Sequence, residues 1–374
     1  MGEEPIVKYA GRLAAVAVVG ALSLAACGTD NNSPAGSTSS AAATSAASGD
    51  SSLSGSINAA GSSAQANAID QWKKDFQGAN SGVSVNYQPS GSGAGIQAFI
   101  AGTVAFAGSD SALKEDEPTQ ADARCKTGKA INIPMVTGPV AVVYNLPGVD
   151  GVQLSPKTLA GIFNSKITKW DDPAIKAENP DAQLPSTPIQ AFHRSDESGT
   201  SDNFTKFLKA TSDWPHEPGK AWPAEAKGQG AKGSDQVAAS VKGAEGAIGY
   251  VELSYAENSE LQKAKVANGS GEFVELTPES AAKTVETAKI TGTGNDLKLE
   301  IDYATKTPGA YPIVLVTYEI TCEKGLPAEE AKLVKAFLTY TASDAGQKAL
   351  TDLGYAPLSG ELLTKVRTAV EAIS

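Results

Sequence analysis

The sequence predicts an α/β fold with two lobes and a hinged ligand cleft between them. Strand-like and helix-like segments alternate along the chain from residue 54 onward, which is typical of a doubly wound sheet. The 374 residues are too many for one compact core and suit two. An apolar stretch at residues 131–145, interrupted by Pro134 and Gly138-Pro139, is long enough to cross between lobes. Two or more such crossings would make a hinge.

The first elements follow from the periodicity of the apolar residues. A strand is expected at 54–60, and a helix follows it because apolar residues between 69 and 76 recur at helical spacing. Alternation at 83–87 predicts a second strand, which is followed by a helix starting at 96–101 and a third strand at 104–108. In such sheets ligands collect beyond the carboxyl ends of the strands.

The second half repeats this order. Strands are expected at 188–194, 247–253 and 311–320, with a helix around 204–208 after the first of them and a C-terminal helix at 328–341. The strand at 311–320 would return the chain to the first lobe. We therefore expect lobe I to comprise residues 54–137 and 311–374, and lobe II to comprise residues 138–310.

The N-terminus predicts export. Lys8 and Arg12 precede an apolar run that ends in Leu24-Ala25-Ala26-Cys27, which indicates a signal peptide at 1–26 that is too short to span a bilayer comfortably. The Leu-Ala-Ala-Cys ending resembles the lipobox of bacterial lipoproteins, and this resemblance implies that Cys27 is lipidated and anchors the chain on the outer face of the cell membrane. The alternative is plain secretion with Cys27 discarded.

The segment at 27–53 is rich in Ser, Thr, Ala and Gly, and Leu53 is its one large apolar residue. Such a composition buries too little surface to order itself, so we expect a flexible tether, with a glycosylated stalk as the alternative. Once Cys27 is set aside, Cys125 and Cys322 remain as a pair in an oxidising compartment. We predict a disulfide between them; the alternative is two buried thiols.

Composition excludes several functions. Lys and Arg number 31 against 42 Asp and Glu, and the net charge of −11 argues against nucleic-acid binding through a broad basic surface. Two His and three Cys leave little material for a zinc site, so we expect neither a metal nor a cofactor. His193 and His216 are assigned no role.

Four polar loops stand where ligands are expected. They are Gly61-Ser62-Ser63, Ser92-Gly93, Ser109-Asp110 and Ser198-Gly199-Thr200. Three of them combine hydroxyl residues with glycine and open a helix, where free backbone N–H groups and a partial positive charge bind oxyanions. Arg194, four residues before Ser198, can add a forked pair of charge-assisted hydrogen bonds. The loops therefore predict an anion site.

Asp110 narrows the choice of anion. A carboxylate repels an anion unless that anion has a proton to donate. Phosphate at neutral pH carries one or two protons, whereas sulfate carries none. A charged hydrogen bond contributes about 1.5–3 kcal/mol, and an unpaired buried charge costs at least as much. Asp110 is therefore predicted to select phosphate against sulfate.

Six separated motifs recur in a fixed order from about Leu53 to the C-terminus: Ala60-Gly61-Ser62-Ser63, residues 87–95, Phe106-Ala107-Gly108-Ser109-Asp110, residues 167–172, residues 194–201 and residues 246–252. In these motifs the chain resembles the phosphate-binding subunit of the high-affinity phosphate ABC importer, a periplasmic-type binding protein. The resemblance implies a two-lobed periplasmic-binding-protein-like fold and a monomeric receptor that delivers phosphate to membrane permease subunits. It implies no enzymatic activity.

The resemblance also implies a role for each site residue. Asp110 matches the proton-accepting carboxylate, Arg194 the ligand arginine, and Asp196 the acid that orients it. The remaining phosphate-binding positions implied are Ser63, Ala64 through its N–H, Ser92, Ser198, Gly199 and Thr200. Ala64 stands where the family often has an aromatic residue, and Gly93 replaces a common second serine.

Three other readings remain open. The nearest is a receptor for sulfate, molybdate or another oxyanion. A phosphate-ester hydrolase is disfavoured because metal ligands and a nucleophile–base pair are missing. An exported serine acyl-enzyme of the penicillin-binding class is suggested by Ser111–Lys114, Ser201–Asn203 and Lys126–Gly128. In that class the motif at Lys126–Gly128 would follow the one at Ser201–Asn203, but here it precedes it. The motifs at Ser111–Lys114 and Lys126–Gly128 also lie too close together in the sequence.

Overall fold

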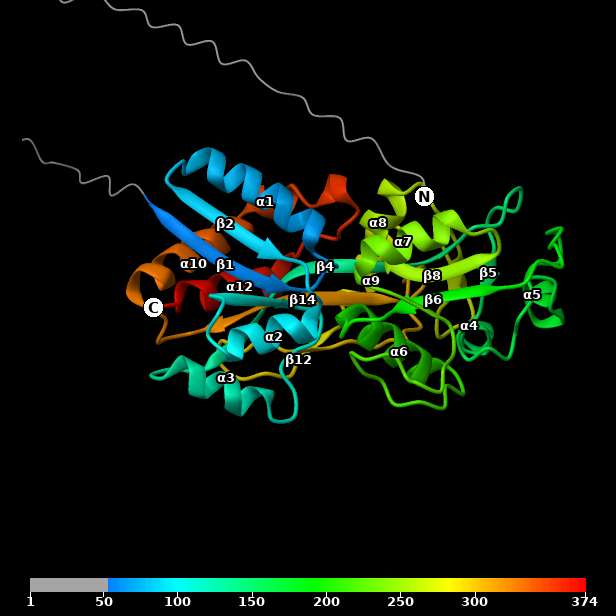
Figure 1. Cartoon of the computed structure of the whole chain (residues 1–374), viewed down its shortest axis with the longest axis horizontal. Helices are drawn as coiled ribbons and strands as arrows, with labels where there is room; N and C mark the ends of the chain where they lie inside the picture. The colour runs from blue at the N-terminus through cyan, green and yellow to red at the C-terminus, as the bar shows by residue number, and fades with distance from the viewer. Residues whose placement is uncertain (1–52) are drawn as a thin grey trace, which may run out of the picture. The chain divides into compact units, whose positions relative to one another are not determined.

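The computed structural model describes residues 53–374 (Figure 1). Residues 1–52 lie outside the described part, and with them the predicted signal peptide, Cys27 and nearly all of the predicted tether. Leu53, the last residue assigned to the tether, is partly buried against a hydrophobic core. No helix of the described residues is long and apolar enough to cross a membrane.

The main sheet has nine strands in the order β2-β1-β3-β14-β4-β8-β6-β7, with β9 paired to β4. The bounds are Gly55–Gly61 for β1, Val83–Gln88 for β2, Phe106–Ser109 for β3, Ala130–Tyr144 for β4, Gln190–Arg194 for β6, Gln229–Ala231 for β7, Ala247–Glu252 for β8, Gln262–Lys263 for β9 and Val314–Cys322 for β14. β1 runs parallel to β2 and β3, and β6 runs parallel to β7 and β8. β14 is antiparallel to β3 and β4, and β8 is antiparallel to β4. The sheet is therefore mixed where the crossing strands join two parallel halves.

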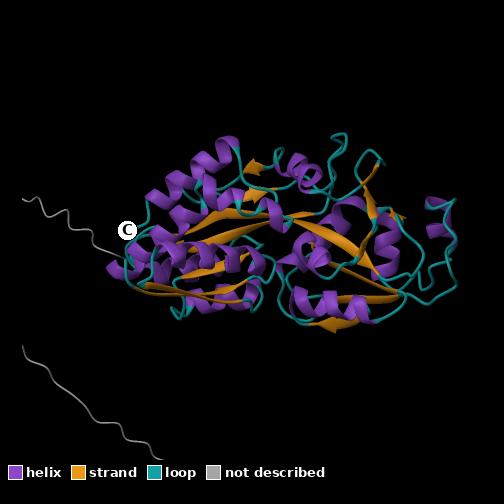
Figure 2. Cartoon of the chain, turned by 90° about the horizontal axis from the view of Figure 1, so that it is seen from above, coloured by secondary structure: helices purple, strands orange, loops and turns teal. Residues whose placement is uncertain are grey.

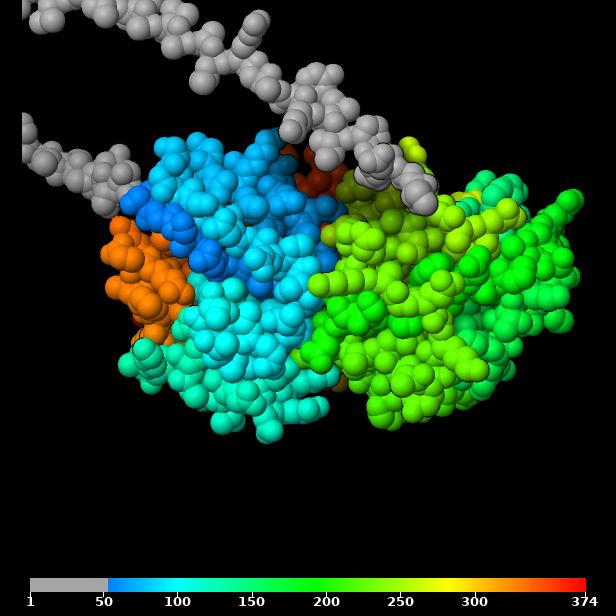
Figure 3. All heavy atoms as spheres, in the orientation of Figure 1, coloured from blue at the N-terminus to red at the C-terminus, as the bar shows by residue number. Residues whose placement is uncertain are grey.

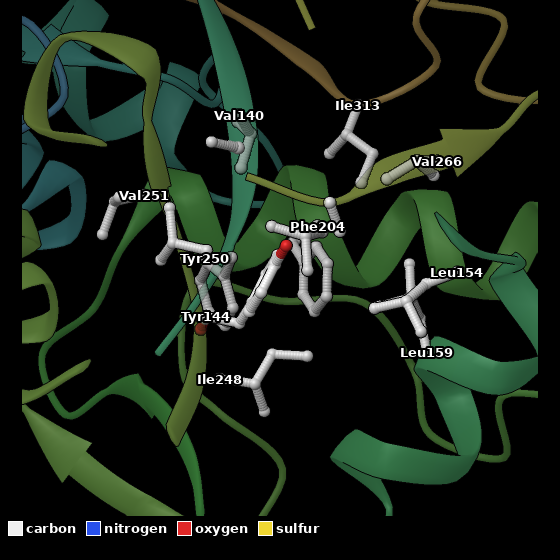
Figure 4. Close-up of a cluster of buried hydrophobic side chains, with 14 of the residues drawn as sticks. Val140, Tyr144, Leu154, Leu159, Phe204, Ile248, Tyr250, Val251, Val266 and Ile313 are labelled. Atoms are coloured by element: carbon white, nitrogen blue, oxygen red, sulfur yellow. The ribbon is translucent and has the colours of Figure 1, made fainter. Parts of the chain in front are cut away.

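Two hydrophobic cores lie along this sheet, and we call the parts built around them lobe I and lobe II. The core of lobe I contains Trp72, Phe99 and Phe337, and that of lobe II contains Phe204 and Tyr250. Figure 4 shows the second core, in which the rings of Phe204 and Tyr250 stack with centroids 4.4 Å apart.

The strands β4 and β14 run from one core to the other. β4 has 15 residues, all buried; its first half packs in lobe I, and its residues from Val140 onward pack in lobe II. β14 lies beside it in the opposite direction, pairing Val314 with Pro139, and a β-bulge interrupts the pairing between Thr317 and Tyr318. Figure 1 shows this pair of strands along the middle of the molecule.

Helices cover both faces of the sheet (Figure 2). In lobe I they are α1 (Ala66–Ala79), α2 (Ser92–Ile100), α3 (Glu117–Cys125), α10 (Ala328–Thr341), α11 (Asp344–Lys348) and α12 (Gly360–Glu371). The others are α4 (Pro156–Phe163), α5 (Pro173–Glu178), α6 (Gly199–Thr211), α7 (Gly233–Gly243), α8 (Leu253–Asn258) and α9 (Pro278–Val285), and a 3₁₀ turn spans Thr351–Leu353. Short strands form two small sheets: β5 (Gln153–Leu154), β10 (Lys265–Ala267) and β11 (Phe273–Val274) form one, and β12 (Lys289–Ile290) and β13 (Leu299–Glu300) form the other.

Most predicted elements are present. α1 buries Ile69, Trp72 and Phe76 as the spacing predicts, and α10 has the predicted bounds. α2 begins at Ser92, four residues before the predicted start, because its first turn is built from the glycine-rich loop. Leu297, within the range predicted for lobe II, is buried in the core of lobe I.

The predicted disulfide is present. Cys125 at the end of α3 is joined to Cys322 at the end of β14, with 5.4 Å between the Cα atoms. Both residues are buried in the core of lobe I. The link spans a sequence separation of 197 residues and ties an early helix to the second crossing strand.

Candidate functional site

The predicted polar loops converge where the two lobes meet. Lobe I brings the loop after β1, the start of α2 and the residue after β3; lobe II brings the end of β6 and the start of α6. In Figure 3 the blue and cyan surface of lobe I meets the green surface of lobe II along the middle of the molecule. The convergence follows from the sheet, since the parallel strands of each half end toward the same place.

Asp110 forms the centre of the lobe I side. It is buried, and its Oδ2 accepts hydrogen bonds from Ser62 Oγ at 2.6 Å and Ser92 Oγ at 3.2 Å. Its Oδ1 accepts one from Thr317 Oγ1 at 2.7 Å. Burial raises the pKa of Asp110 to about 6, and the nearby charge of Glu252 raises it as well, against the lowering effect of the Ser62 hydroxyl. The result is a buried acceptor surrounded by neutral donors.

Arg194 forms the centre of the lobe II side. Its side chain is 1% exposed and makes a forked pair with Asp196, with Nη2 2.5 Å from Oδ2 and Nε donating to Oδ1 at 2.8 Å. Burial lowers the pKa of Arg194, but the paired Asp196 carboxylate more than compensates, so the pKa is raised. Burial raises the pKa of Asp196 and the guanidinium lowers it by more. Asp196 therefore holds a permanently charged Arg194 in one orientation.

The remaining edge of the guanidinium points at hydroxyls. Arg194 Nη1 donates to Ser234 Oγ at 3.1 Å and to Thr200 Oγ1 at 3.4 Å. Thr200 Oγ1 in turn donates to Glu252 Oε1 at 2.6 Å. Arg194 and Thr200 are thereby held together by a network that is buried throughout.

The start of α6 lies directly against Asp110. Ser198 is the N-cap, and its hydroxyl accepts from the Ser201 N–H at 3.2 Å. The Gly199 N–H donates to Ser92 Oγ of lobe I at 3.2 Å. A Cβ atom at Gly199 would lie 2.5 Å from Asp110 Cβ and 2.6 Å from Ser92 Oγ, so only glycine allows the two lobes to come this close.

Ser63 makes a separate link between the lobes. Its Oγ lies 3.1 Å from Ser234 Oγ and accepts from the Ser234 N–H at 3.2 Å. The Ala64 N–H donates to Ser62 Oγ at 3.0 Å. Of the two neighbouring serines, it is therefore Ser62 that contacts Asp110, and Ser63 that contacts lobe II.

Four residues of this cluster were not predicted as site residues. Ser234 could have been found, because Gly233-Ser234 opens α7 with the same glycine and hydroxyl pattern as the predicted loops. Ser62 lay inside a predicted loop but was passed over in favour of its neighbour. Thr317 and Glu252 lie in strands that are buried throughout. Glu252 ends the family motif at 246–252, which could have pointed to it, whereas the sequence around Thr317 gives no signal.

The remaining polar motifs have structural partners. Ser111 Oγ donates to Asp202 Oδ2 at 2.6 Å, and Lys114 forms an ion pair with the same Asp202, so both ends of the Ser111–Lys114 motif contact one buried carboxylate. His193 stacks on Trp222, and His216 contacts Asn164. Within residues 53–374 no three His, Cys, Asp or Glu side chains gather as a metal site would require.

Known proteins resemble the chain along nearly all of its length. The PBP superfamily domain matches residues 40–345. The phosphate-binding protein PstS3 of Mycobacterium bovis (strain BCG / Pasteur 1173P2) is 42% identical over 369 residues, covering 97% of this chain and 98% of that protein. The phosphate-binding protein PstS 2 of Mycobacterium tuberculosis (strain ATCC 25618 / H37Rv) is 38% identical over 381 residues, covering 98% of this chain and all of the relative.

Solved structures share the fold. A high-affinity periplasmic phosphate-binding protein (PfluDING), solved with bound phosphate at pH 8.5, superposes with a TM-score of 0.68 at 23% identity, over 84% of this chain and 93% of that one. A phosphate-binding protein from Stenotrophomonas maltophilia superposes with a TM-score of 0.65 at 21% identity, over 84% and 94% of the two chains. The chain belongs to the PBP superfamily and, within it, to the PstS family of solute-binding proteins.

Proposed function

We propose that the protein captures inorganic phosphate between its two lobes, outside the cytoplasm, and delivers it to an ABC importer. The observation that carries this proposal is a buried carboxylate, Asp110, brought together with the buried cation Arg194 and the N-terminus of α6. A charged donor set alone would suit any oxyanion. An acceptor in the same place suits an anion that still carries a proton. Relatives at 42% and 38% identity are named phosphate-binding proteins, which supports the same conclusion.

Each residue then has a defined role. Arg194, held by Asp196, supplies the positive charge, and Asp110 accepts a proton of the bound phosphate. Neutral donors complete the proposed set: Ser63, Ala64 through its N–H, Ser92, Ser198, Gly199 and Thr200. To this set the structure's contacts lead us to add Ser62 and Ser234, since both touch the charged centres directly.

The wider proposal concerns how the protein works in the cell. Phosphate that contacts both lobes favours the closed arrangement, and the closed surface is what the permease subunits would bind. We propose that the protein works as a monomer without a catalytic step, anchored through lipidated Cys27 on the outer face of the membrane. Mass spectrometry of the protein from membranes tests the anchor, since an unmodified or missing Cys27 would contradict it.

Isothermal titration of the exported chain with phosphate and with sulfate tests the function. Phosphate is expected to bind at least about 100-fold more tightly, because sulfate has no proton to donate to the buried Asp110 and the two negative charges would repel each other, at a cost of about 3 kcal/mol. Equal affinities would contradict the proposed selection, and no heat with either anion would contradict the proposed function as a whole.

A further inference from the structure

A chain of hydrogen bonds runs from Asp110 through Ser62 and Tyr87 to Gln65. Ser62 Oγ donates to Asp110, and the backbone carbonyl of Ser62 accepts from Tyr87 OH at 2.7 Å. Tyr87 OH accepts in turn from Gln65 Nε2 at 3.1 Å. Gln65, at the N-cap position of α1, is completely buried. The chain therefore links the start of α1 to the loop that holds Asp110.

Glu319 lies at the far end of this chain. It stands on β14 directly opposite Gly108 of β3, and side chains of directly opposed residues lie on the same face of a sheet. The space above Gly108 is filled by Gln65 and Tyr87, since a Cβ atom there would lie 2.1 Å from Gln65 Nε2 and 2.5 Å from Tyr87 OH. Glu319 is completely buried beside the Gln65 amide.

The groups at this end lack partners. Within residues 53–374, neither carboxylate oxygen of Glu319 has a hydrogen-bond partner, and Gln65 Oε1 has none. Burying an unpaired polar atom costs about 1–3 kcal/mol, and a charged one costs more. One proton would remove two of these three deficits, because a protonated Glu319 can donate to Gln65 Oε1.

The direction of the hydrogen bonds favours that proton. The Ser62 carbonyl can only accept, so the Tyr87 hydroxyl must donate its single hydrogen there. Tyr87 can then only accept from Gln65, so the amide must turn Nε2 toward Tyr87 and Oε1 away from it. The buried Gln65 Oε1 is then left without a donor, which a protonated Glu319 can supply and an ionised Glu319 cannot.

We propose that Glu319 is protonated in the folded protein and, by donating to Gln65, is a positioning residue for Ser62 and Asp110. The inference rests on the proposed phosphate site, whose acceptor it would hold in place. The proposed role needs two residues together, the acid Glu319 on β14 and the amide Gln65 at the start of α1.

The surroundings of Glu319 agree with this protonation. Burial raises its pKa to about 8, the Gln65 amide acts to lower the pKa, and the charge of Asp110 raises it. Tyr87 of β2 is the other titratable group facing it, and its pKa is also raised by burial. Its neighbours across the sheet, Gly108 of β3 and Ile133 of β4, carry no charge. Because the folded pKa is above the ordinary value, the proton stabilises the fold fully at low pH, and this stabilisation is lost as pH rises through about 8.

Glu319→Gln tests the role of the proton, because the glutamine amide has nearly the same shape, does not titrate, and can donate to Gln65 at every pH. Thermal unfolding without phosphate, followed from about pH 6 to about pH 9.5, should show wild type losing stability relative to Glu319→Gln as pH rises. Asp110 titrates equally in both proteins and cancels. Glu361→Gln, at a side chain that is 82% exposed, is the matched control and should follow wild type. Parallel profiles for wild type and Glu319→Gln would show an ionised Glu319 and overturn the proposal.

Phosphate affinity tests the positioning role. The ratio of the wild-type Kd to that of Glu319→Gln should rise about fivefold from near-neutral pH to about pH 9.5, and the same comparison in a Tyr87→Phe background should show no such rise. Glu319→Leu, which has no donor, should bind phosphate more weakly at every pH. If the unfolding difference appears and the Kd ratio stays constant, Glu319 is protonated but does not position the site, and the proposal is wrong. Failure of the proposed function would look different, because neither protein would bind phosphate at any pH.

Discussion

The two sides of the site handle charge in opposite ways. On the lobe I side a single carboxylate, Asp110, is covered by the hydroxyls of Ser62, Ser92 and Thr317, and burial raises its pKa. On the lobe II side a single guanidinium, Arg194, is held by a carboxylate in a forked pair. One side can recognise a proton and the other can recognise a negative charge. Under the proposed function, selectivity and affinity are therefore set by different lobes.

This division suits an acidic protein. The net charge of −11 gives no general attraction for an anion, so the attraction must come from one oriented cation and from the dipoles at helix starts. Glu252 and Asp110 are both buried near Arg194, and their charges limit how much negative charge the site accepts. A protonated anion carries less negative charge than a fully ionised one, so these two carboxylates repel it less.

The largest expected effect is on the lobe II side. Arg194→Ala should weaken phosphate binding by about 3–5 kcal/mol, or about 150- to 5,000-fold, because Asp196 and the anion would both lose a buried partner. Calorimetry measures the loss. Arg367→Ala, at an arginine paired with the exposed Asp344, is the control and should bind as wild type does. Unchanged affinity of Arg194→Ala would remove Arg194 from the site.

The next effect concerns the choice of anion. Asp110→Asn should raise sulfate affinity relative to phosphate by about 10- to 100-fold, since the amide can donate to an oxygen that carries no proton. Titration of the variant with both anions gives the ratio. A variant that still excludes sulfate as strongly as wild type would show that Asp110 is not the selector.

A smaller effect on phosphate affinity tests how closely the start of α6 must approach Asp110. Gly199→Ala should weaken phosphate binding by about 1–3 kcal/mol, because the added methyl group collides with Asp110 and Ser92. Gly243→Ala, at the end of α7, has no atom within 4 Å of the new Cβ and serves as the matched control. If Gly199→Ala binds as tightly as its control, α6 does not need to approach Asp110 in the bound state.

The smallest effect is a change with pH. Because the pKa of Asp110 is raised to about 6, the carboxylate becomes protonated as pH falls below that value and no longer requires a proton on the anion. The preference for phosphate over sulfate should therefore decline between about pH 7 and about pH 5, whereas Asp110→Asn should show no such decline. Competition binding at these pH values measures it, and a constant preference would place the proton acceptor elsewhere.

The sequence predicted the two charged centres better than their partners. Arg194, Asp196 and the Ser198–Thr200 turn follow one another along the chain, so local pattern was enough to join them. The contact of Thr317 with Asp110 depends on how β14 pairs with β3, and a register of that kind between segments some 200 residues apart leaves no local trace. For the same reason no sequence signal placed Glu319 opposite Gly108.

The fold shows a similar limit. Helix α10 lies where it was predicted, around residues 328–341, because its apolar residues recur at helical spacing. Helix α2 was predicted to start four residues too late, because Ser92 and Gly93 are typical of turns and their residue types do not indicate a helix. The antiparallel pairing of the crossing strands could not be predicted, because both directions bury the same apolar residues.

The interrupted pairing at Thr317 and Tyr318 has a mechanical consequence. Everywhere else along β14 the crossing strands are paired continuously, so separating the lobes would bend the sheet most easily where the ladder is already broken. Thr317 sits at that weak point and also donates to Asp110. Any flexing of the backbone there would pull directly on the carboxylate proposed to accept the ligand's proton, so under the proposed function ligand recognition and the opening movement share one threonine.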